Sequence, residues 1–516
     1  MKDKYTVVFA TPEMMIPELP EPACGANFRG GLGILAGDVM EGLAKRGVQA
    51  IGIVPLYQLH WVTKEDISAT VSALPLRCVA EVLGRKIEAK EVNRGGILVL
   101  GIWAPEVFNV LYTPDRWQRL QQEALLGHAV PAVLKTLGIK PDIVWLNEGH
   151  TAVTIPAMKE EAYFAGAKFL FTTHTPVSEG MEKFPGDDWW FNALGISEKY
   201  RSIFIKGGID MTNAAIILSD WVNGVSQEHC EVTQKMFPEF VSKIVGITNG
   251  SSRELWLSYY LKALGERFTL AGFVRAQRAS KKELLGFIKK RTGIKFDSKK
   301  PLLGWVRRMA WYKQQYPMLN PILRAICAEK GQIVETELGK LEGLGFQVFS
   351  AGRAHESDST CLGWMGKFQE QMSEPELSGK FIFIPEYNLE LLKLAAQGCD
   401  VWFSCPLPKW EACGTGDQRA AINGKINLTT QAGGAKEYIL EYNPVTGEGN
   451  GFFIEPYEPS QVYNKLRIIS DLYYDWMAGK DGRWLELMRA SFEAGKGLDI
   501  LQATKQYEKI FENLLG

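Results

Sequence analysis

Short apolar runs alternate with amphipathic stretches through the first half of the chain. The run TVVFA at 6–10 suits a strand buried on both faces, and the helical periodicity of 34–46 suits an amphipathic helix. Such alternation of strand and helix predicts a parallel, doubly wound sheet. The expected strands are 6–10, 49–54, 97–102, 143–146, 168–173, 214–218 and 244–247, and the expected helices include 34–46, 114–137 and 150–165.

A second alternating block follows a long, charged stretch at 255–292, which we expect to be a helical connector. The strands expected in this block are 302–306, 347–351, 381–384, 401–404 and 425–428. The predicted fold class is therefore α/β, with two Rossmann-like doubly wound domains. We place the N-terminal domain at 1–254 and the C-terminal domain at 255–483, with the helical tail 484–516 packing back on the first domain.

Composition narrows the possible partners. The 516 residues include 46% apolar residues and carry a formal net charge of −1, so neither a nucleic acid nor an anionic membrane is expected as a partner. No apolar run approaches the length of a membrane span. The eight cysteines form no CxxC pair, which favours reduced thiols and a cytoplasmic location. Oligomeric state is not readable, and a homo-oligomer stays open.

A glycine-rich loop, Gly30-Gly31-Leu32-Gly33, stands between the first expected strand and the helix at 34–46. Backbone N–H groups of such a loop, together with the positive end of the helix, suit a phosphate. The spacing is not that of a nicotinamide-cofactor fingerprint. A tight turn with no ligand explains the glycines equally well.

Three cations, Arg307, Arg308 and Lys313, follow the strand at 302–306. Ligands of open α/β sheets bind at the carboxyl ends of the strands, so this position favours a phosphate or diphosphate site over a solvated surface cluster.

A second glycine-rich segment follows the strand at 401–404, where Glu411 precedes Gly414 and Thr415 at the start of a helical stretch. The helix start suits a phosphate, and the carboxylate suits sugar hydroxyls, although an ordinary helix cap is an equal alternative.

His174 ends the strand at 168–173 and is followed by a proline loop. That position raises it above the other five histidines as a catalytic candidate. The spacing of the histidines contains no HExxH motif, and we expect no metal site.

Taken as an ordered set, these segments resemble the α-glucan phosphorylases and, more distantly, the glycogen and starch synthases of the GT-B glycosyltransferase superfamily. The matching segments are GGLGILAGD (30–38), VWLNEGH (144–150), FTTHTPVSEGMEKFP (171–185), VNGVSQEH (222–229), ITNG (247–250), VRRMAWYK (306–313) and EACGTGDQRAAINGKINL (411–428). The resemblance implies a GT-B fold, in which two Rossmann-like domains face a cleft that holds the site.

The resemblance also implies roles for individual residues. His174 would lie beside the transferred sugar, Arg308 and Lys313 would hold the leaving phosphate, and Glu411 would bind sugar hydroxyls. The residues implied to bind the donor or its phosphate are Gly30, Gly31, Gly33, Asn249, Gly414 and Thr415.

One position departs from the family. Phosphorylases carry a lysine eight residues after this glutamate, where it forms a Schiff base with pyridoxal phosphate, and here the residue is Arg419. Arginine stays protonated and cannot form the imine, so we expect no pyridoxal phosphate and no other cofactor. The distal phosphate of a nucleotide sugar would fill the space instead, with Arg419 expected to contact it.

The leading hypothesis is a retaining hexosyltransferase that moves a glucosyl or similar group from a nucleotide sugar, or another sugar phosphate, to an oligosaccharide or small hydroxyl acceptor. One alternative is phosphorolysis of an α-glucan without pyridoxal phosphate. Another is a non-catalytic relative that binds sugars, against which the retained Arg308, Lys313 and Glu411 argue.

Overall fold

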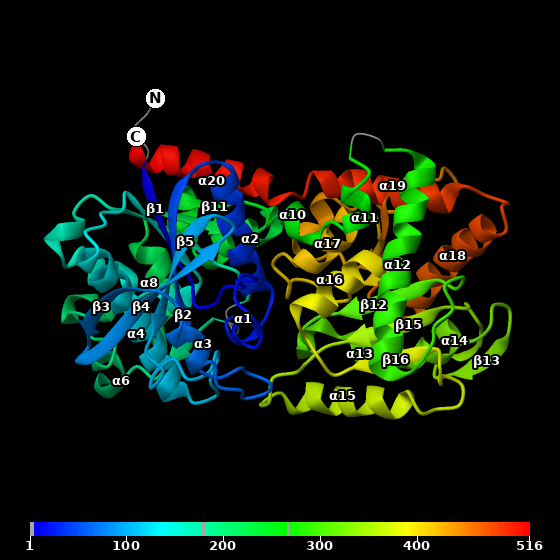
Figure 1. Cartoon of the computed structure of the whole chain (residues 1–516), viewed down its shortest axis with the longest axis horizontal. Helices are drawn as coiled ribbons and strands as arrows, with labels where there is room; N and C mark the ends of the chain where they lie inside the picture. Colours follow the sequence, from blue (N-terminus) through cyan, green and yellow to red (C-terminus); the bar gives the residue numbers. More distant parts are fainter. Residues whose placement is uncertain (1–4, 178–180, 266–267) are drawn as a thin grey trace. The chain divides into compact units, whose positions relative to one another are not determined.

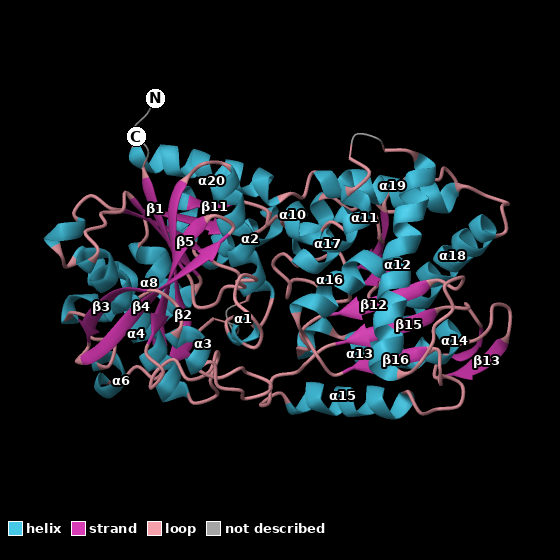
Figure 2. Ribbon diagram, viewed as in Figure 1, coloured by secondary structure: helices cyan, strands magenta, loops and turns pink. Residues whose placement is uncertain are grey.

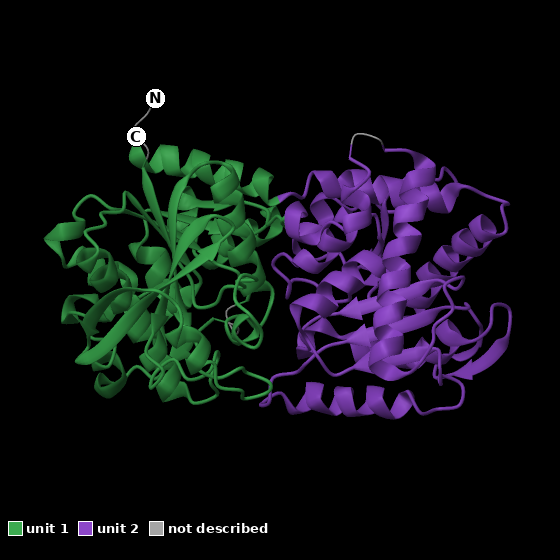
Figure 3. Cartoon of the chain, in the orientation of Figure 1, with its two compact units in different colours: residues 1–252, 500–516 green, residues 253–499 purple. Residues whose placement is uncertain are grey.

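The computed structural model describes residues 5–177, 181–265 and 268–516, and the chain divides into two compact units (Figure 3). Unit 1 comprises residues 1–252 and 500–516, and unit 2 comprises residues 253–499. The segment 484–516 was expected to pack as a whole on the first domain. Its first helix belongs to unit 2 instead, and only its last helix belongs to unit 1.

Among the described residues of unit 1, nine strands form one sheet in the order β11-β10-β7-β6-β1-β2-β5-β4-β3 (Figure 1). Neighbours from β11 to β5 run parallel, whereas β5, β4 and β3 pair antiparallel at one edge. The strands are β1 (Thr6–Ala10), β2 (Gln49–Leu56), β3 (Leu76–Val82), β4 (Arg85–Arg94), β5 (Ile97–Trp103), β6 (Ile143–Asn147), β7 (Lys168–Thr172), β10 (Trp221–Gly224) and β11 (Ile244–Gly246), and a separate antiparallel pair is β8 (Lys183–Phe184) with β9 (Ile209–Asp210).

Helices pack against this sheet (Figure 2), so its central strands β1 and β6 are almost entirely buried and mostly apolar. The longest described helix of unit 1, α4, begins where the Asp115 side chain accepts a hydrogen bond from the backbone N–H of Gln118. The unit 1 helices are α1 (Ala23–Ala26), α2 (Gly31–Lys45), α3 (Ser68–Ser72), α4 (Arg116–Thr136), α5 (Thr154–Lys159), α6 (Asp188–Asn192), α7 (Arg201–Phe204), α8 (Met211–Leu218), α9 (Gln227–Met236) and α20 (Ile500–Leu515).

The C-terminal helix α20 completes unit 1, where it lies beside α2 (Figure 1). The Tyr507 ring packs 4.1 Å from the Trp145 ring of β6, measured between centroids, and its hydroxyl accepts a 3.0 Å hydrogen bond from Asn223 Nδ2. The chain end therefore contributes to the core under β6 and β10.

The prediction of a strand at 214–218 was wrong, because this segment is the second half of helix α8. A short apolar run cannot distinguish a buried strand from a buried helix. The deciding signal is Asp210, whose carboxylate accepts from the N–H of Asn213 and caps the helix. The helix expected at 150–165 is also shorter, since its only α-helical segment is α5.

In the described part of unit 2, six parallel strands form a sheet in the order β16-β15-β12-β17-β18-β19. Three of them have the predicted bounds. The strands are β12 (Leu302–Val306), β15 (Gln347–Ala351), β16 (Phe381–Ile384), β17 (Val401–Phe403), β18 (Ile426–Thr429) and β19 (Gly451–Phe453), with a separate hairpin of β13 (Ile333–Thr336) and β14 (Gly339–Glu342).

The expected helical connector at 255–292 is divided into separate helices. Only α12 is long. Thr269 caps its first turn, and Gly293 follows its last residue with a φ of +75°, a conformation that favours glycine. The unit 2 helices are α10 (Arg253–Trp256), α11 (Tyr259–Lys262), α12 (Leu270–Thr292), α13 (Gln315–Leu319), α14 (Leu323–Cys327), α15 (Ser359–Gln371), α16 (Leu389–Gly398), α17 (Thr415–Ile422), α18 (Pro459–Met477) and α19 (Arg483–Lys496). Within the described ranges, no helix is long and apolar enough to cross a lipid bilayer.

Candidate active site

His174 follows β7 at the carboxyl edge of the unit 1 sheet, as the sequence predicted. Its Nε2 lies 2.6 Å from Asn147 Oδ1, at the end of the neighbouring strand β6. Because Asn147 Nδ2 donates to Thr11, its oxygen is the acceptor and His174 Nε2 carries the proton. Burial lowers the pKa of His174 to about 3, and nearby His229 adds to the shift. The imidazole is therefore neutral at physiological pH, and it positions by hydrogen bonding.

Glu148 holds the backbone of His174 in place and was not singled out from the sequence. Its carboxylate accepts from the N–H groups of His174, at 2.8 Å, and Gly149, at 3.1 Å. The residue is buried and has a φ of +71° with ψ of +161°, a conformation that side chains rarely adopt. Burial raises its pKa, although these hydrogen bonds oppose the rise. A strained acid at a strand end is typical of functional sites, and the signal in the sequence is NEGH directly after an apolar strand.

Hydrogen bonds connect His174 to the glycine-rich loop. Asn147 Nδ2 donates to Thr11 Oγ1 at 3.0 Å, and Thr11 Oγ1 donates to the carbonyl of Glu13 at the same distance. The carboxylate of Glu13 then lies against the first turn of α2, where a Cβ on Gly33 would come within 2.8 Å of it. His174 and the loop thus share one edge of the unit 1 sheet.

The glycines of this loop differ in their surroundings. Gly30 is the N-cap residue of α2 and has an extended conformation. A Cβ on Gly33 would also meet the Phe28 side chain at 2.7 Å, so close packing accounts for this glycine. A Cβ on Gly31 would have nothing within 4 Å, which makes Gly31 the position of the loop that faces open space. Asn249 is buried beyond β11, and its N–H donates to the carbonyl of Val225.

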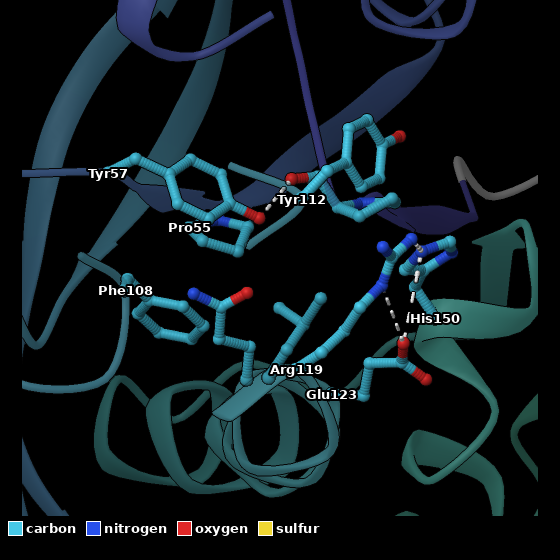
Figure 4. A pocket seen from close by; sticks show the side chains of 10 residues that line it. Pro55, Tyr57, Phe108, Tyr112, Arg119, Glu123 and His150 are labelled. Carbon is cyan, nitrogen blue, oxygen red and sulfur yellow. Dashed lines mark hydrogen bonds and ion pairs between the residues drawn. The ribbon is translucent and has the colours of Figure 1, made fainter. Parts of the chain in front are cut away.

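A small pocket, with room for about one water molecule inside its open mouth, lies beside α4 in unit 1 (Figure 4). Arg119 and Glu123 project into it from α4, toward His150. The Arg119 guanidinium donates to His150 Nε2 at 3.3 Å and pairs with Glu182 Oε2 at 2.8 Å. The apolar and aromatic walls of the pocket are formed by Pro12, Pro55, Tyr57, Phe108, Tyr112 and Leu126.

The polar floor of this pocket has unused hydrogen-bonding capacity. Both carboxylate oxygens of Glu123 are buried without a hydrogen-bond partner, as are Arg119 Nε and His150 Nδ1. Burial raises the pKa of Glu123, with Glu182 adding to the rise and Arg119 opposing it. Burial and Arg119 together lower the pKa of His150 to about 3, so this ring is neutral. Such groups are suited to a hydroxyl-bearing ligand.

Among the described residues, Glu123, His150 and Glu182 also form a group whose ligand atoms lie within 4.8 Å of one another, as a metal site would require. The Arg119 guanidinium lies among them and contributes the positive charge that a cation would bring. The absence of a metal stays a prediction from the sequence.

In unit 2, Glu411 lies between two cations. Arg307 Nη2 donates to its Oε1 at 2.9 Å, and Lys313 Nζ donates to its Oε2 at 2.6 Å. Burial alone would raise the pKa of Glu411, but Arg307, Lys313 and Arg308 outweigh it and hold this pKa at about 2. Arg307 donates further to Ser404 Oγ, at the end of β17. The ionised carboxylate thus fixes the positions of two cations at the carboxyl edge of the sheet.

The second glycine-rich segment packs directly on this group. Gly414 is the N-cap residue of α17, and a Cβ there would lie 2.8 Å from Arg307 Nη2 and 3.0 Å from Glu411 Oε1. Only a glycine therefore lets the helix start approach the ion pairs this closely. Thr415 is buried in the first turn, where its hydroxyl accepts a hydrogen bond from Arg419.

Arg308 and Arg419 lie near this group. Arg307 donates directly to Glu411, and partly exposed Arg308 adds to the positive charge that lowers the pKa of Glu411. The contact of Arg308 with a leaving phosphate stays a prediction. The Arg419 guanidinium is buried over the Trp256 ring, 4.2 Å from its centroid. Contact of Arg419 with a distal phosphate stays a prediction.

Comparison with known proteins gives consistent matches. The starch synthase catalytic domain family matches residues 7–243, which lie within unit 1. A maltodextrin phosphorylase from Thermococcus litoralis is 26% identical across 90% of the chain, which spans 66% of that relative's length. A glycogen synthase from Clostridium kluyveri is 23% identical over a region that covers 76% of the chain and 77% of that relative's length. The catalytic domain of starch synthase IV from Arabidopsis thaliana, bound to ADP and acarbose, superposes with a TM-score of 0.75 at 19% identity, covering 99% of both chains.

The chain has the GT-B fold. The predicted fold class and the predicted resemblance are therefore confirmed. Within this fold, unit 1 groups His174 with the loop at 30–33, and unit 2 groups Lys313, Glu411 and Gly414. Three of the residues in the matching segment 171–185, numbers 178–180, lie outside the described residues.

Proposed function

We propose that this protein is a retaining glycosyltransferase that moves a hexosyl group, with glucose as the expected sugar, from a nucleotide sugar to an oligosaccharide or small hydroxyl acceptor. The observation that carries the proposal is the charge arrangement in unit 2. Three cations, Arg307, Arg308 and Lys313, act on one ionised carboxylate beside the N-terminus of α17. The excess positive charge and the helix end favour an anion such as a diphosphate.

Transfer with retention needs little acid–base chemistry from side chains. The bond between the anomeric carbon and the phosphate oxygen breaks, the acceptor oxygen bonds to the anomeric carbon on the same face, and the acceptor proton passes to the departing phosphate. Negative charge grows on the phosphate in the transition state, where fixed cations stabilise it. The pairs that Glu411 makes with Arg307 and Lys313 hold these cations in position before the donor binds.

The proposed reaction uses no pyridoxal phosphate. The residue at the position of the Schiff-base lysine is Arg419, whose guanidinium lies over Trp256 and donates to Thr415. A guanidinium stays protonated and is not a nucleophile toward an aldehyde, so the residues present do not fit a covalently bound cofactor.

The unit 1 pocket is proposed to receive one hydroxyl of the acceptor, since it has room for little more than a water molecule. The unsatisfied atoms of Arg119, Glu123 and His150 suit such a hydroxyl. The similar starch synthase IV structure holds acarbose and ADP, which supports an oligosaccharide and a nucleotide as ligand classes. The eight cysteines are free thiols, and a cytoplasmic location stays a prediction from them.

The direct test is a donor screen that begins with ADP-glucose and maltoheptaose. We expect transfer to give longer oligosaccharides, and we expect Lys313→Met to lower kcat about 10²- to 10³-fold, as loss of one preorganised charge donor does. A matched control is Lys367→Met, which removes a lysine of α15 that lies over the Tyr316 ring. Absence of transfer, hydrolysis and thermal shift with every nucleotide sugar would contradict the proposal.

Phosphorolysis without pyridoxal phosphate is a second candidate, favoured by the similarity to the Thermococcus phosphorylase. It predicts release of a sugar 1-phosphate from maltoheptaose that depends on orthophosphate. The same enzyme preparation, incubated with orthophosphate in place of the nucleotide sugar, distinguishes the two reactions.

A further inference from the structure

A cluster of three tryptophans lies on the surface of unit 1. Trp189, in α6, is 70% exposed, although an indole is among the largest apolar side chains. Its ring stacks on Trp117 of α4, with 5.3 Å between centroids and 19° between planes. The Trp190 ring packs edge-on against the Trp117 ring, with 5.1 Å between centroids. We call Trp117, Trp189 and Trp190 the tryptophan platform.

The tryptophan platform is rigidly supported. Asp187 caps α6 through hydrogen bonds from the N–H groups of Trp189 and Trp190, at 3.0 and 3.2 Å. Trp117 and Trp190 are partly buried against the unit 1 core. The outer ring of Trp189 is thus held in a fixed orientation with most of its surface in water, which lowers the entropy cost of binding a flat ligand to it.

The charges around the platform are balanced. Asp188 pairs with Arg201 at 3.0 Å, and Arg116 pairs with Glu182 at 3.5 Å. A charge-balanced rim gives no net attraction for a nucleic acid or an anionic membrane. It does offer hydrogen-bond donors and acceptors around an apolar ring. A sugar ring has the complementary arrangement, with flat C–H faces and hydroxyls at its edge.

The platform and the unit 1 pocket share helix α4. Arg116 and Trp117 belong to the first turn of α4, and the pocket residues Arg119 and Glu123 belong to its first two turns. At 1.5 Å of rise per residue, Trp117 and Glu123 lie about 9 Å apart along the helix axis. Glu182 connects platform and pocket directly, because it pairs with Arg116 on the platform side and with Arg119 in the pocket.

From this geometry we propose that the tryptophan platform is a second carbohydrate-binding site, which holds an α-glucan chain remote from its reacting end by stacking on Trp189. The proposal rests on the proposed function for the choice of ligand, since an oligosaccharide acceptor is expected there. It assigns the enzyme a preference for long acceptors over short ones. Short acceptors do not reach the platform.

The test is native electrophoresis of the whole protein in gels with and without glycogen. We expect glycogen to retard the wild type and Trp189→Ala to weaken binding about tenfold, the change expected when roughly 60 Å² of indole face is no longer covered. Trp189→Phe should restore part of the retardation. Tyr259→Ala is the matched control, because Tyr259 is 76% exposed and makes an edge contact with Tyr260.

Three outcomes would overturn the inference: no retardation of the wild type, equal retardation of Trp189→Ala, or self-association of the wild type that Trp189→Ala abolishes. The last would identify the platform as a contact between copies of the chain. Gel binding needs no turnover, so retardation without sugar transfer would contradict only the proposed function. Where transfer occurs, Trp189→Ala should raise KM for glycogen about tenfold and leave KM for maltotriose and kcat unchanged.

Discussion

Glu411 is the residue on which the unit 2 site depends, because its charge balances two buried cations. Side-chain exposures of 9% for Arg307 and 8% for Lys313 mean that either cation would be costly to leave unpaired. The sequence suggested a sugar-binding carboxylate at this position. The structure adds that the same carboxylate holds the cations in place, which is a distinct role.

Replacement of Glu411 by Gln should therefore destabilise unit 2 in a pH-dependent way. The folded pKa of about 2 lies below the unfolded value, so ionised Glu411 contributes its full stability above about pH 4.5 and loses it as the pH falls toward 2. We expect a difference from the wild type of about 3 kcal/mol in the free energy of unfolding at pH 7, shrinking below pH 4.5.

Urea unfolding between pH 3 and 8 measures this difference. The control is Glu374→Gln, since Glu374 pairs with the half-exposed Arg324 and should change stability by less than about 1 kcal/mol at any pH. If the difference in the free energy of unfolding between the wild type and Glu411→Gln grew as the pH falls, the ionised state assigned to Glu411 would be contradicted.

At the scale of elements, sequence patterns located the buried parallel strands well. β1, β12, β15 and β16 have the predicted bounds, because continuous apolar runs between helices leave little choice. The antiparallel strands β3 and β4 were missed, since they alternate charged and apolar residues and read as loops. The run at 214–218 was misassigned, as its length alone does not separate helix from strand.

The candidate site was predictable where a residue lies in the segment that follows an apolar strand, as His174, Lys313 and Glu411 do. Arg307 and Arg308 are adjacent, and only side-chain packing shows that Arg307 donates to Glu411. The pocket floor joins residues from α4, His150 and Glu182, which are distant in sequence and share no motif. Such a group cannot be recognised before the fold is known.

The two glycine-rich segments should respond differently to a methyl group. Gly414→Ala would force a Cβ into the Arg307–Glu411 pair, and we expect it to cost about 1–3 kcal/mol of stability. Gly31→Ala has open space and lies in the first turn of a helix, so stability should stay equal or rise by up to about 1 kcal/mol.

Guanidinium unfolding of both variants measures this contrast. Equal destabilisation of the two variants would contradict the difference in packing between Gly31 and Gly414. A Gly31→Ala variant that is stable but has a raised KM for the donor would support an approach of this loop to the ligand.

For the molecule as a whole, the chain end belongs to the first unit. Tyr507 packs on Trp145 and accepts a hydrogen bond from Asn223, and both of these partners belong to the unit 1 sheet. Tyr507→Ala should therefore destabilise unit 1 by about 3–5 kcal/mol, the usual cost of deleting a buried aromatic side chain, while unit 2 keeps its stability.

Hydrogen exchange read by mass spectrometry separates the two units. We expect faster exchange in peptides of β6, β10 and α20 and unchanged exchange in those of β12, β15 and β18. Equal acceleration in both units, or none in unit 1, would contradict the assignment of α20.

The central claim is that a phosphate-activated sugar is transferred without an aldehyde cofactor. Its most direct measurement is the product formed from ADP-glucose and maltoheptaose by purified protein whose absorbance spectrum has been recorded for bound pyridoxal species. The account predicts longer oligosaccharides from protein with no such absorbance. Activity that appears only with added pyridoxal phosphate would contradict it.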